Sequence, residues 1–255
     1  MNLKAIVLDF RSRVALTLFL IWILAIWHFR SLNVVLCPLL SVLTVTALDV
    51  LITYVRSKKI YYPGASFVSG FLVGLIIAPT EKWWVFVLAA TVASLSKQFI
   101  GAGIRQHVFN PAAFGIMTVS LVFGVPVAWW AVSWSWWLLL ILVPAMIRIL
   151  WKMKRLWLPA MFLATYFLYL LTIFDAQTAI RTLIDGSVML FALVMLPEPI
   201  TSPAFGKFKY FFGPMVAILA ISLSELTPLS EIFLPSLLIA NLVGFMALRI
   251  KRIPK

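Results

Sequence analysis

Residues 97–124 read KQFIGAGIRQHVFNPAAFGIMTVSLVFG, a short basic and polar segment followed by an apolar run that begins at Asn110 and Pro111. Asparagine is a preferred N-cap because its side-chain oxygen accepts an otherwise unpaired backbone N–H of the first turn. Proline fits the next position because the N–H that it lacks would have no partner there. Small residues such as Ala112 and Gly115 allow another backbone to approach closely. The stretch therefore predicts a helix that begins at the edge of a membrane or inside it.

The composition is that of a membrane protein. The 255 residues are 64% hydrophobic and only 11% charged, and several apolar runs reach or approach membrane-spanning length. The single cysteine, Cys37, excludes an intramolecular disulfide and a cysteine-ligated iron–sulfur cluster or zinc site. The net charge of +13 fits basic cytoplasmic loops in a lipid bilayer, and we expect no nucleic-acid partner.

Ten apolar segments predict an all-α polytopic membrane protein. Several of them are shorter than the roughly 20 residues that cross a bilayer as a straight helix. The clearest cases are 65–78 and 183–196, and each of these is followed by a proline, Pro79 or Pro197. Half-length or broken helices are tolerated at membrane depth only where protein or a water-lined cavity surrounds them. We therefore expect an interior site. The segments are 14–29, 34–54, 65–78, 83–96, 108–124, 136–150, 156–174, 183–196, 209–224 and 232–249.

The charge of the loops predicts the orientation of the chain. If the segments alternate and the N-terminus is inside, 18 of the 21 basic residues lie in cytoplasmic loops, as the positive-inside rule requires. Segment 14–29 is interpreted as a retained first span because no small-residue cleavage site follows it. The expected location is the cytoplasmic (inner) membrane, with 1–13 and 250–255 as cytoplasmic termini.

The ten segments divide into two halves that resemble each other. Residues 14–124 would form a first five-helix repeat, 125–135 an extracytoplasmic linker, and 136–249 a second repeat. In each half a short apolar run ends at a proline, and a later helix carries an asparagine, Asn110 or Asn241, among small and apolar residues. Because five is odd, the second repeat would be inverted, and inverted repeats place a site where their broken helices meet.

Several blocks of the sequence resemble the Nqr2/RnfD family, which comprises the RnfD component of the Rnf electron-transport complex and the NqrB component of the sodium-translocating NADH:quinone reductase. Residues 97–115 are similar to the family's KQ…G…FNPA signature. Further blocks follow in the family's order: ASFVSGFLVGLIIAP (65–79), a basic loop ending in LWLP (148–159), GSVMLFALVMLPEPITSP (186–203) and LLIANLV (237–243). The resemblance covers nearly the whole chain from about residue 14.

The resemblance implies a fold of two inverted five-helix repeats similar to urea transporters, in a component of a complex that couples electron transfer to sodium or proton movement. Other membrane or reductase subunits would be its partners. The family carries a non-covalent riboflavin, and an FMN esterified to a threonine in a long loop. Here that loop is only residues 124–135 and has no threonine, and a family block that reads SGAT is Asp185-Gly186-Ser187-Val188. This chain is therefore expected to be a short form without covalent FMN.

Other redox or nucleotide sites are not predicted. The two histidines, His28 and His107, fall on opposite faces of the predicted topology and cannot jointly ligate one haem iron. The pair Gly101 and Gly103 lacks the third glycine of a dinucleotide fingerprint, and no βαβ pattern surrounds it. An electron carrier would have to be a non-covalent flavin (riboflavin or FMN), a quinone or a partner's cofactor.

The candidate site residues are polar or small side chains on the broken helices and on the two asparagine helices. Ionisable residues inside a membrane are functional candidates by default, but Asp49 could equally pair with Arg56 or a neighbouring helix end. Capping and turn formation would explain Asp185, Glu198 and Thr201 as well. No metal ligands or catalytic residues are predicted. The cofactor-binding candidates are Ser66, Ser69, Asn110, Pro111, Gly115, Ser187, Glu198, Thr201 and Asn241, and the ion-pathway candidates are Asp49 and Asp185.

Two functions fit these features. The first is an electron-transport protein that holds a non-covalent flavin or quinone at the repeat interface. The second is a transporter or channel for a small solute or vitamin, with the same fold and no redox chemistry. A pathway lined by Asn110, Asn241 and half-helix ends would serve either function.

Overall fold

The computed structural model of the protein describes residues 9–59, 62–101, 107–203 and 207–250. These residues form helices joined by turns, with two isolated β-bridges and no β-strand among them. The expectation of an all-α fold is confirmed. The elements are α2 (Phe10–Phe29), α3 (Leu32–Ser57), α4 (Gly64–Ile76), α5 (Trp83–Phe99), α6 (Pro111–Phe123), α7 (Trp130–Ser133), η1 (Trp136–Leu138), α8 (Leu139–Lys152), α9 (Trp157–Ile173), α10 (Ala176–Leu183), α11 (Gly186–Leu190), the π-helical turn η2 (Phe191–Met195), α12 (Phe208–Leu226) and α13 (Phe233–Ile250).

Each of the ten predicted apolar segments coincides with a helix or with two consecutive helical elements. The first helix begins earlier than predicted, at Phe10, because the Asp9 side chain accepts the backbone N–H of Arg11 at 3.1 Å and caps it. Two short helices were not predicted: α7 lies within the predicted linker, and α10 precedes α11. Most of the predicted termini, 1–13 and 250–255, lie outside the described residues.

Three helices of the described chain are long and apolar enough to cross a membrane by themselves, namely α2, α3 and α12. The bent pair α10 and α11–η2, with an angle of 50° between its parts, could make a fourth. Shorter apolar helices include α4, α6 and α9. The outward faces carry large exposed apolar side chains such as Leu43, Leu51 and Leu168, as a lipid-facing surface does.

Glycines bring the helices of the first half into close contact. A Cβ on Gly74 of α4 would lie 2.3 Å from the Cα of Pro38 in α3, and one on Gly70 would lie 2.5 Å from the Cα of Val42. Gly115 of α6 similarly faces α5, where a Cβ would lie 2.3 Å from the carbonyl oxygen of Ala89. These distances are shorter than real Cβ contacts, so only glycine permits this packing.

The second half is held together by aromatic rings and by one further glycine. Phe191 of η2 lies 5.1 Å from Phe233 of α13 and 5.3 Å from Phe162 of α9, centroid to centroid. All three rings are buried, and such offset or tilted pairs add to the burial of their area. Gly213 of α12 lies directly against the α9 backbone at Leu158.

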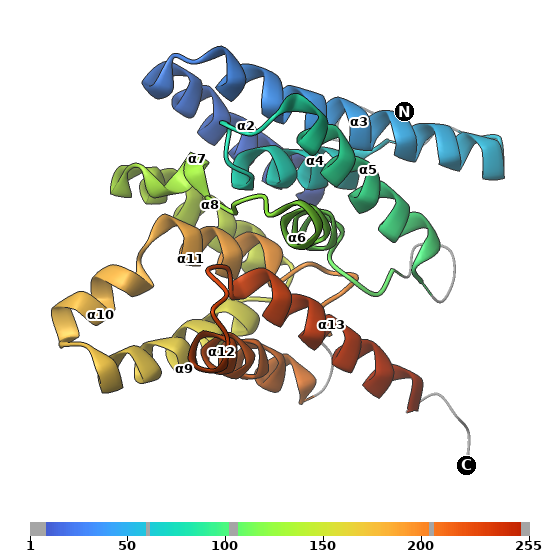
Figure 1. Ribbon diagram of the computed structural model, residues 1–255. Coiled ribbons are helices and arrows are strands. Elements are labelled where there is room, and N and C mark those ends of the chain that lie inside the picture. Colours follow the sequence, from blue (N-terminus) through green and yellow to red (C-terminus); the bar gives the residue numbers. More distant parts are fainter. Residues whose placement is uncertain (1–8, 60–61, 102–106, 204–206, 251–255) are drawn as a thin grey trace.

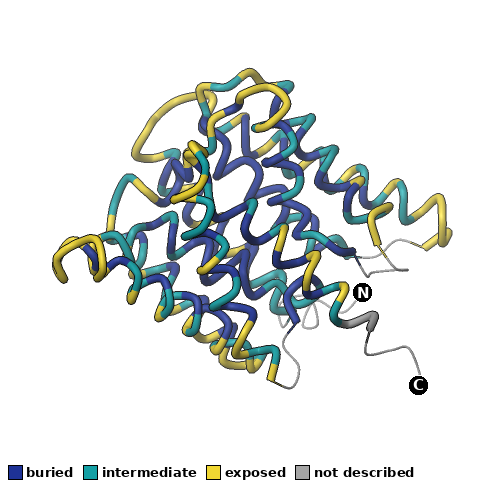
Figure 2. Tube along the Cα trace, turned by 60° about the horizontal axis from the view of Figure 1, so that its bottom comes forward, coloured by how far each residue is buried: buried dark blue, intermediate teal, exposed yellow. Residues whose placement is uncertain are grey.

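Among the described residues the halves meet where α2 contacts α8 and where α6 contacts α13. In Figure 1 the blue helices α2 and α3 lie on one side of the molecule and the orange and red elements on the other, with α6 between them. The buried residues run through the middle of the molecule and exposed ones follow its outer helices and ends, as Figure 2 shows. A single buried core therefore includes residues of both halves.

Gly74→Ala is expected to lower the free energy of unfolding by about 1–3 kcal/mol, because the new methyl group overpacks the contact between α4 and α3. The measurement is equilibrium unfolding in mixed detergent micelles, followed by tryptophan fluorescence. Gly64→Ala in the same helix is the matched control, since its Cβ would meet only side-chain atoms, those of Tyr62 and Arg11. Equal stability of the two variants would contradict the packing assigned to Gly74.

Candidate functional site

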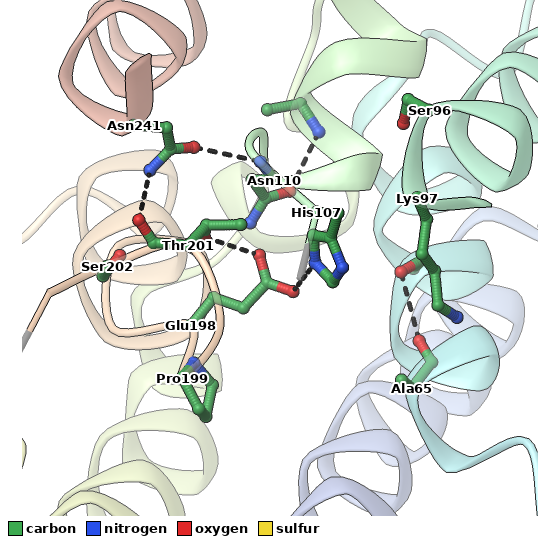
Figure 3. Close-up of polar contacts among 12 residues, drawn as sticks. Ala65, Ser96, Lys97, His107, Asn110, Glu198, Pro199, Thr201, Ser202 and Asn241 are labelled. Carbon is green, nitrogen blue, oxygen red and sulfur yellow. Dashed lines mark hydrogen bonds and ion pairs between the residues drawn. The ribbon is translucent and has the colours of Figure 1, made fainter. Parts of the chain in front are cut away.

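Asn110 is the centre of the polar contacts between the halves. Its side-chain oxygen accepts the backbone N–H of Ala113 at 3.0 Å and so caps α6. Its own backbone N–H donates to the Oδ1 atom of Asn241 in α13 at 3.0 Å, and its Nδ2 donates to the carbonyl oxygen of Met195 in η2 at 3.4 Å. Asn110 thus joins α6, α13 and η2, and Figure 3 shows its contact with Asn241. Both asparagines are buried, so every one of these bonds replaces a lost contact with water.

The turn that follows η2 supplies the other polar groups of this contact region. Asn241 Nδ2 donates to the carbonyl oxygen of Thr201 at 3.2 Å. The Thr201 hydroxyl donates to Oε2 of Glu198 at 3.0 Å, and Oε1 of Glu198 lies 3.3 Å from Nε2 of His107. The chain of contacts therefore runs from α13 through the turn to the segment that leads into α6 (Figure 3).

Arg155 holds this turn from the side of α9. Its guanidinium donates to four backbone carbonyl oxygens, those of Pro197, Glu198, Pro199 and Ser202, at 3.1–3.3 Å. Burial lowers the pKa of Arg155, while the charge of Glu198 acts in the opposite direction. The turn carries prolines at 197 and 199 and cannot continue the helix, so its carbonyls need a donor from elsewhere.

A small cavity lies beside these contacts. Its volume is about 70 Å³, and apolar side chains of α4, α8 and η2 form most of its wall. Its polar lining consists of Arg11, Ser69, Asn110 and Glu198. This volume holds a few water molecules. It is well below the roughly 300–1,000 Å³ of pockets that enclose drug-sized ligands, so the cavity as it stands does not fit a flavin ring.

Asp49 belongs to a separate polar cluster formed by α3, α4 and α5. Its carboxylate forms an ion pair with Lys97 and accepts the hydroxyl groups of Ser66 at 2.5 Å and Ser94 at 2.7 Å. Gln98 also donates to it, at 3.2 Å. Of the two pairings that the sequence allowed for Asp49, the one with Arg56 is not found and the one with a neighbouring helix end is: Lys97, a residue of the KQ signature, lies in the last turn of α5.

Residues of the predicted linker cap the C-terminal end of the half-helix α4. The carbonyl oxygen of Ile76 accepts the backbone N–H groups of Ala128 at 2.9 Å and Trp129 at 3.1 Å. The indole N–H of Trp130 donates to the carbonyl oxygen of Gly74 at 3.1 Å. The linker is therefore a structural part of the core, and Trp129 and Trp130 are buried.

Glu231 connects the same linker to α13. It accepts the indole N–H of Trp129 at 2.7 Å and the backbone N–H groups of Phe233 and Leu234, each at 2.8 Å. It thereby caps the first turn of α13. Burial raises the pKa of the Glu231 carboxyl, and its three hydrogen bonds oppose this change.

The structure brings some of the predicted site residues together and places others elsewhere. Asn110, Pro111, Glu198, Thr201 and Asn241 meet at the contact between the halves, where Ser69 lines the same cavity. Five predicted residues lie away from it. Asp49 and Ser66 bond to each other in the separate cluster, and Gly115 packs on α5. Asp185 caps α11 by accepting the backbone N–H and the hydroxyl of Ser187.

Sequence reasoning did not place Lys97, Arg155 or Glu231 in this polar framework. The partners that these residues hold in other elements, Asp49, the carbonyl of Pro197 and Trp129, are 42 to 102 residues away in the chain. One signal in the sequence could have identified Lys97: a buried carboxylate such as Asp49 requires a cation nearby. His107, which the sequence did not place at this site, contacts Glu198 through Nε2 at 3.3 Å.

Comparison with known proteins gives one family and a set of distant relatives. A sequence model of the NQR2, RnfD, RnfE family matches residues 7–134. The D subunit of the ion-translocating oxidoreductase complex of Buchnera aphidicola is 26% identical over 106 residues, which are 40% of this chain and 30% of that protein. The corresponding D subunits of Cronobacter sakazakii and Shigella sonnei are 25% and 27% identical over 107 and 108 residues, each 41% of this chain. The aligned part spans only 30–31% of the length of these relatives.

Lys97→Met is expected to lower the free energy of unfolding by about 3–5 kcal/mol, because it leaves Asp49 as a buried charge without its cation. The double variant Asp49→Asn/Lys97→Met is expected to recover part of that loss, since no charge then remains in the cluster. The measurement is equilibrium unfolding of the purified variants, with Lys82→Met, at an exposed position, as the control. Additive losses in the double variant would show that the two charges do not stabilise each other.

Proposed function

Because the chain belongs to the NQR2, RnfD, RnfE family, we propose that it is an integral-membrane component of an Rnf- or Nqr-like electron-transport system. In this proposal a non-covalent flavin or a quinone binds at the contact between the two halves, and electron transfer there is coupled to ion movement. Relatives named as D subunits of an ion-translocating oxidoreductase complex support this assignment. Its partners would be other membrane or reductase subunits.

The proposed architecture is ten spans in two inverted repeats, with both termini on the cytoplasmic side of the inner membrane. The helix contacts support it. The two halves have the same pattern of contacts. In the first half α2 contacts α4, α3 contacts α4 and α5, and α5 contacts α6. In the second half, in the same order, α8 contacts α11 and η2, α9 contacts η2 and α12, and α12 contacts α13. The halves then meet through first helices, α2 and α8, and through last helices, α6 and α13. A two-fold axis relating the halves would produce such self-equivalent contacts.

The observation that carries the proposal is the meeting of α6, η2 and α13 at Asn110 beside a cavity. In many transporter folds the binding site is formed where broken helices of the two repeats meet. The donor and acceptor groups of Asn110, Ser69 and Glu198 lie at the cavity, and most of its remaining wall is apolar. A ring system would need a wider form of this cavity than the volume of about 70 Å³ found here.

The cavity volume also favours a second candidate, transport of a small solute. A space of about 70 Å³ with few polar groups fits a molecule of a few non-hydrogen atoms better than a cofactor. In that case the half-helix ends would line a pathway and no redox chemistry would occur in this chain. The two candidates differ in one readily observed property, the colour of the purified protein.

We expect the protein purified in mild detergent to show flavin absorbance and fluorescence that move to the supernatant on acid precipitation. A non-covalent flavin is released when the fold is lost, whereas an esterified FMN would remain in the pellet. The linker 124–135 has no threonine to hold one. Asn241→Ala is expected to lower the flavin content, and Thr118→Ala, which removes only a hydroxyl bonded within α6, is the control.

Flavin in the pellet would contradict the assignment of a short form without covalent FMN. A colourless protein that binds added quinone would keep the electron-transport proposal with a different carrier. A colourless protein that binds neither flavin nor quinone would overturn that proposal and favour solute transport.

A further inference from the structure

We propose that Glu198 and His107 form a proton-binding pair at the contact between the halves, reached through the cavity beside Asn110. Glu198 is the member that exchanges protons with water in the cavity. His107 is the buried member, and it holds the second exchangeable proton position. The ligand of this site is thus a proton, not a metal ion or an organic cofactor.

The geometry of the pair defines the role of each nitrogen of His107. Nε2 lies 3.3 Å from Oε1 of Glu198, so with an ionised carboxylate it is the nitrogen that carries hydrogen and donates. Nδ1 is then an acceptor with a free lone pair, and it has no hydrogen-bond partner in the described part of the chain. The His107 residue is only 5% exposed. A buried ring nitrogen without a partner, next to a carboxylate, is a place where a proton is stabilised.

Glu198 connects this imidazole to water. Its side chain is 22% exposed and lines the cavity. A proton delivered there forms a bond to a Glu198 oxygen and leaves the carboxylate neutral. Alternatively a proton binds Nδ1 of His107, and the resulting imidazolium faces the carboxylate as an ion pair. In either case one proton is bound, the charge of the pair rises by one, and no electron is transferred.

The other buried or capping acidic residues already have strong partners. Asp49 is neutralised by Lys97 and accepts three further hydrogen bonds. Asp185 caps α11 through Ser187, and Glu231 accepts three donors at the start of α13. Glu198 differs from them because its carboxylate contacts only Thr201 and His107 among the described residues, and because it lines the cavity.

A proton fits this site better than a sodium ion. Sodium would require several oxygen ligands, and the turn 197–202 supplies the backbone carbonyls on either side of Glu198. Four of these carbonyls already accept the guanidinium of Arg155. A metal ion bound at Glu198 would therefore lie beside a fixed positive charge and without these carbonyls as ligands. A proton needs only one lone pair.

Few other charges of the described chain face the pair. Arg155 lies behind the turn, and Arg11 of α2 lines the same cavity. Arg148 and Lys152 of α8 are exposed, Lys97 of α5 is paired with Asp49, and α4, α6 and η2 carry no ionisable side chain. A guanidinium keeps its proton in proteins. Glu198 and His107 are therefore the members of this set that can gain or lose a proton.

The test uses the fact that the chain has only two histidines, His28 and His107. The full-length protein is labelled with ¹⁵N-histidine, reconstituted in lipid nanodiscs and titrated by NMR, where nitrogen chemical shifts distinguish protonated from unprotonated ring positions. His28→Gln assigns the signals. We expect His107 to carry hydrogen on Nε2 only at high pH and to gain a proton on Nδ1 as the pH falls. Glu198→Gln is expected to move the midpoint of that change by about one pH unit to lower pH, since the imidazolium loses its carboxylate.

Glu225→Gln, which alters an exposed carboxylate bonded to Tyr169, should leave the midpoint of His107 unchanged. Glu198→Asp, which keeps the charge on a shorter side chain, should restore most of the shift. Three results would overturn the proposal: hydrogen on Nδ1 at high pH, an unchanged midpoint in Glu198→Gln, or a midpoint that differs between sodium chloride and choline chloride at equal ionic strength. The last result would mean that a metal ion competes for the site.

The coupling of this proton site to electron transfer rests on the proposed function, but proton binding itself does not. The titration requires no flavin, quinone or partner protein. A normal titration in a colourless protein that binds neither flavin nor quinone would therefore support the proton site while the electron-transport proposal fails. The reverse combination, bound flavin with no response of His107 to Glu198→Gln, would overturn only the proton site.

Discussion

The structure depends on one physical constraint: helices that end inside an apolar environment must satisfy the unpaired backbone groups at their ends. In lipid each such group costs several kcal/mol if it has no partner. α6 begins at Asn110, whose side chain accepts the N–H of Ala113 while Pro111 removes another donor. The N–H of Asn110 itself donates to Asn241 of the other half. The start of one helix is thus completed by a residue 131 positions away.

The same constraint explains why the turn 196–203 and the linker are held by so many hydrogen bonds. The end of η2 places carbonyl groups where no helix continues, and Arg155 and Asn110 donate to them. In the first half the carbonyls of Gly74 and Ile76 at the end of α4 accept donors from residues 128–130. A linker that serves as a helix cap cannot also be a free loop. Its two buried tryptophans, Trp129 and Trp130, belong to the fold.

The sequence predicts features formed by residues that are adjacent in the chain, and it misses contacts between residues that are far apart in the chain. The start of α6 at Asn110 was predictable because a cap and the helix that it begins are adjacent in the chain. The ten helical segments were predictable because apolar runs are continuous. The ion pair of Asp49 with Lys97 was not, since a rule based on neighbours favours Arg56 of the same helix. The site was predicted in its asparagines and Glu198, but the donors that hold its backbone, above all Arg155, come from other elements.

The buried ionisable residues differ in how completely they are paired, and this difference distinguishes residues that only stabilise the fold from residues that can bind a proton. A buried ionisable group that is fully bonded stabilises one arrangement of helices, and changing its protonation would break that arrangement. Asp49 has this character: its carboxylate has a cation and three further donors. Glu198 and His107 do not, because the carboxylate lines the cavity and the imidazole retains one nitrogen unpaired within the described chain. The fold can therefore accept a proton at this pair without losing a helix contact, since the backbone of the turn is held independently by Arg155. Because Arg155 supports the backbone of the turn while the Glu198 side chain stays available, this part of the interface is suited to binding a proton.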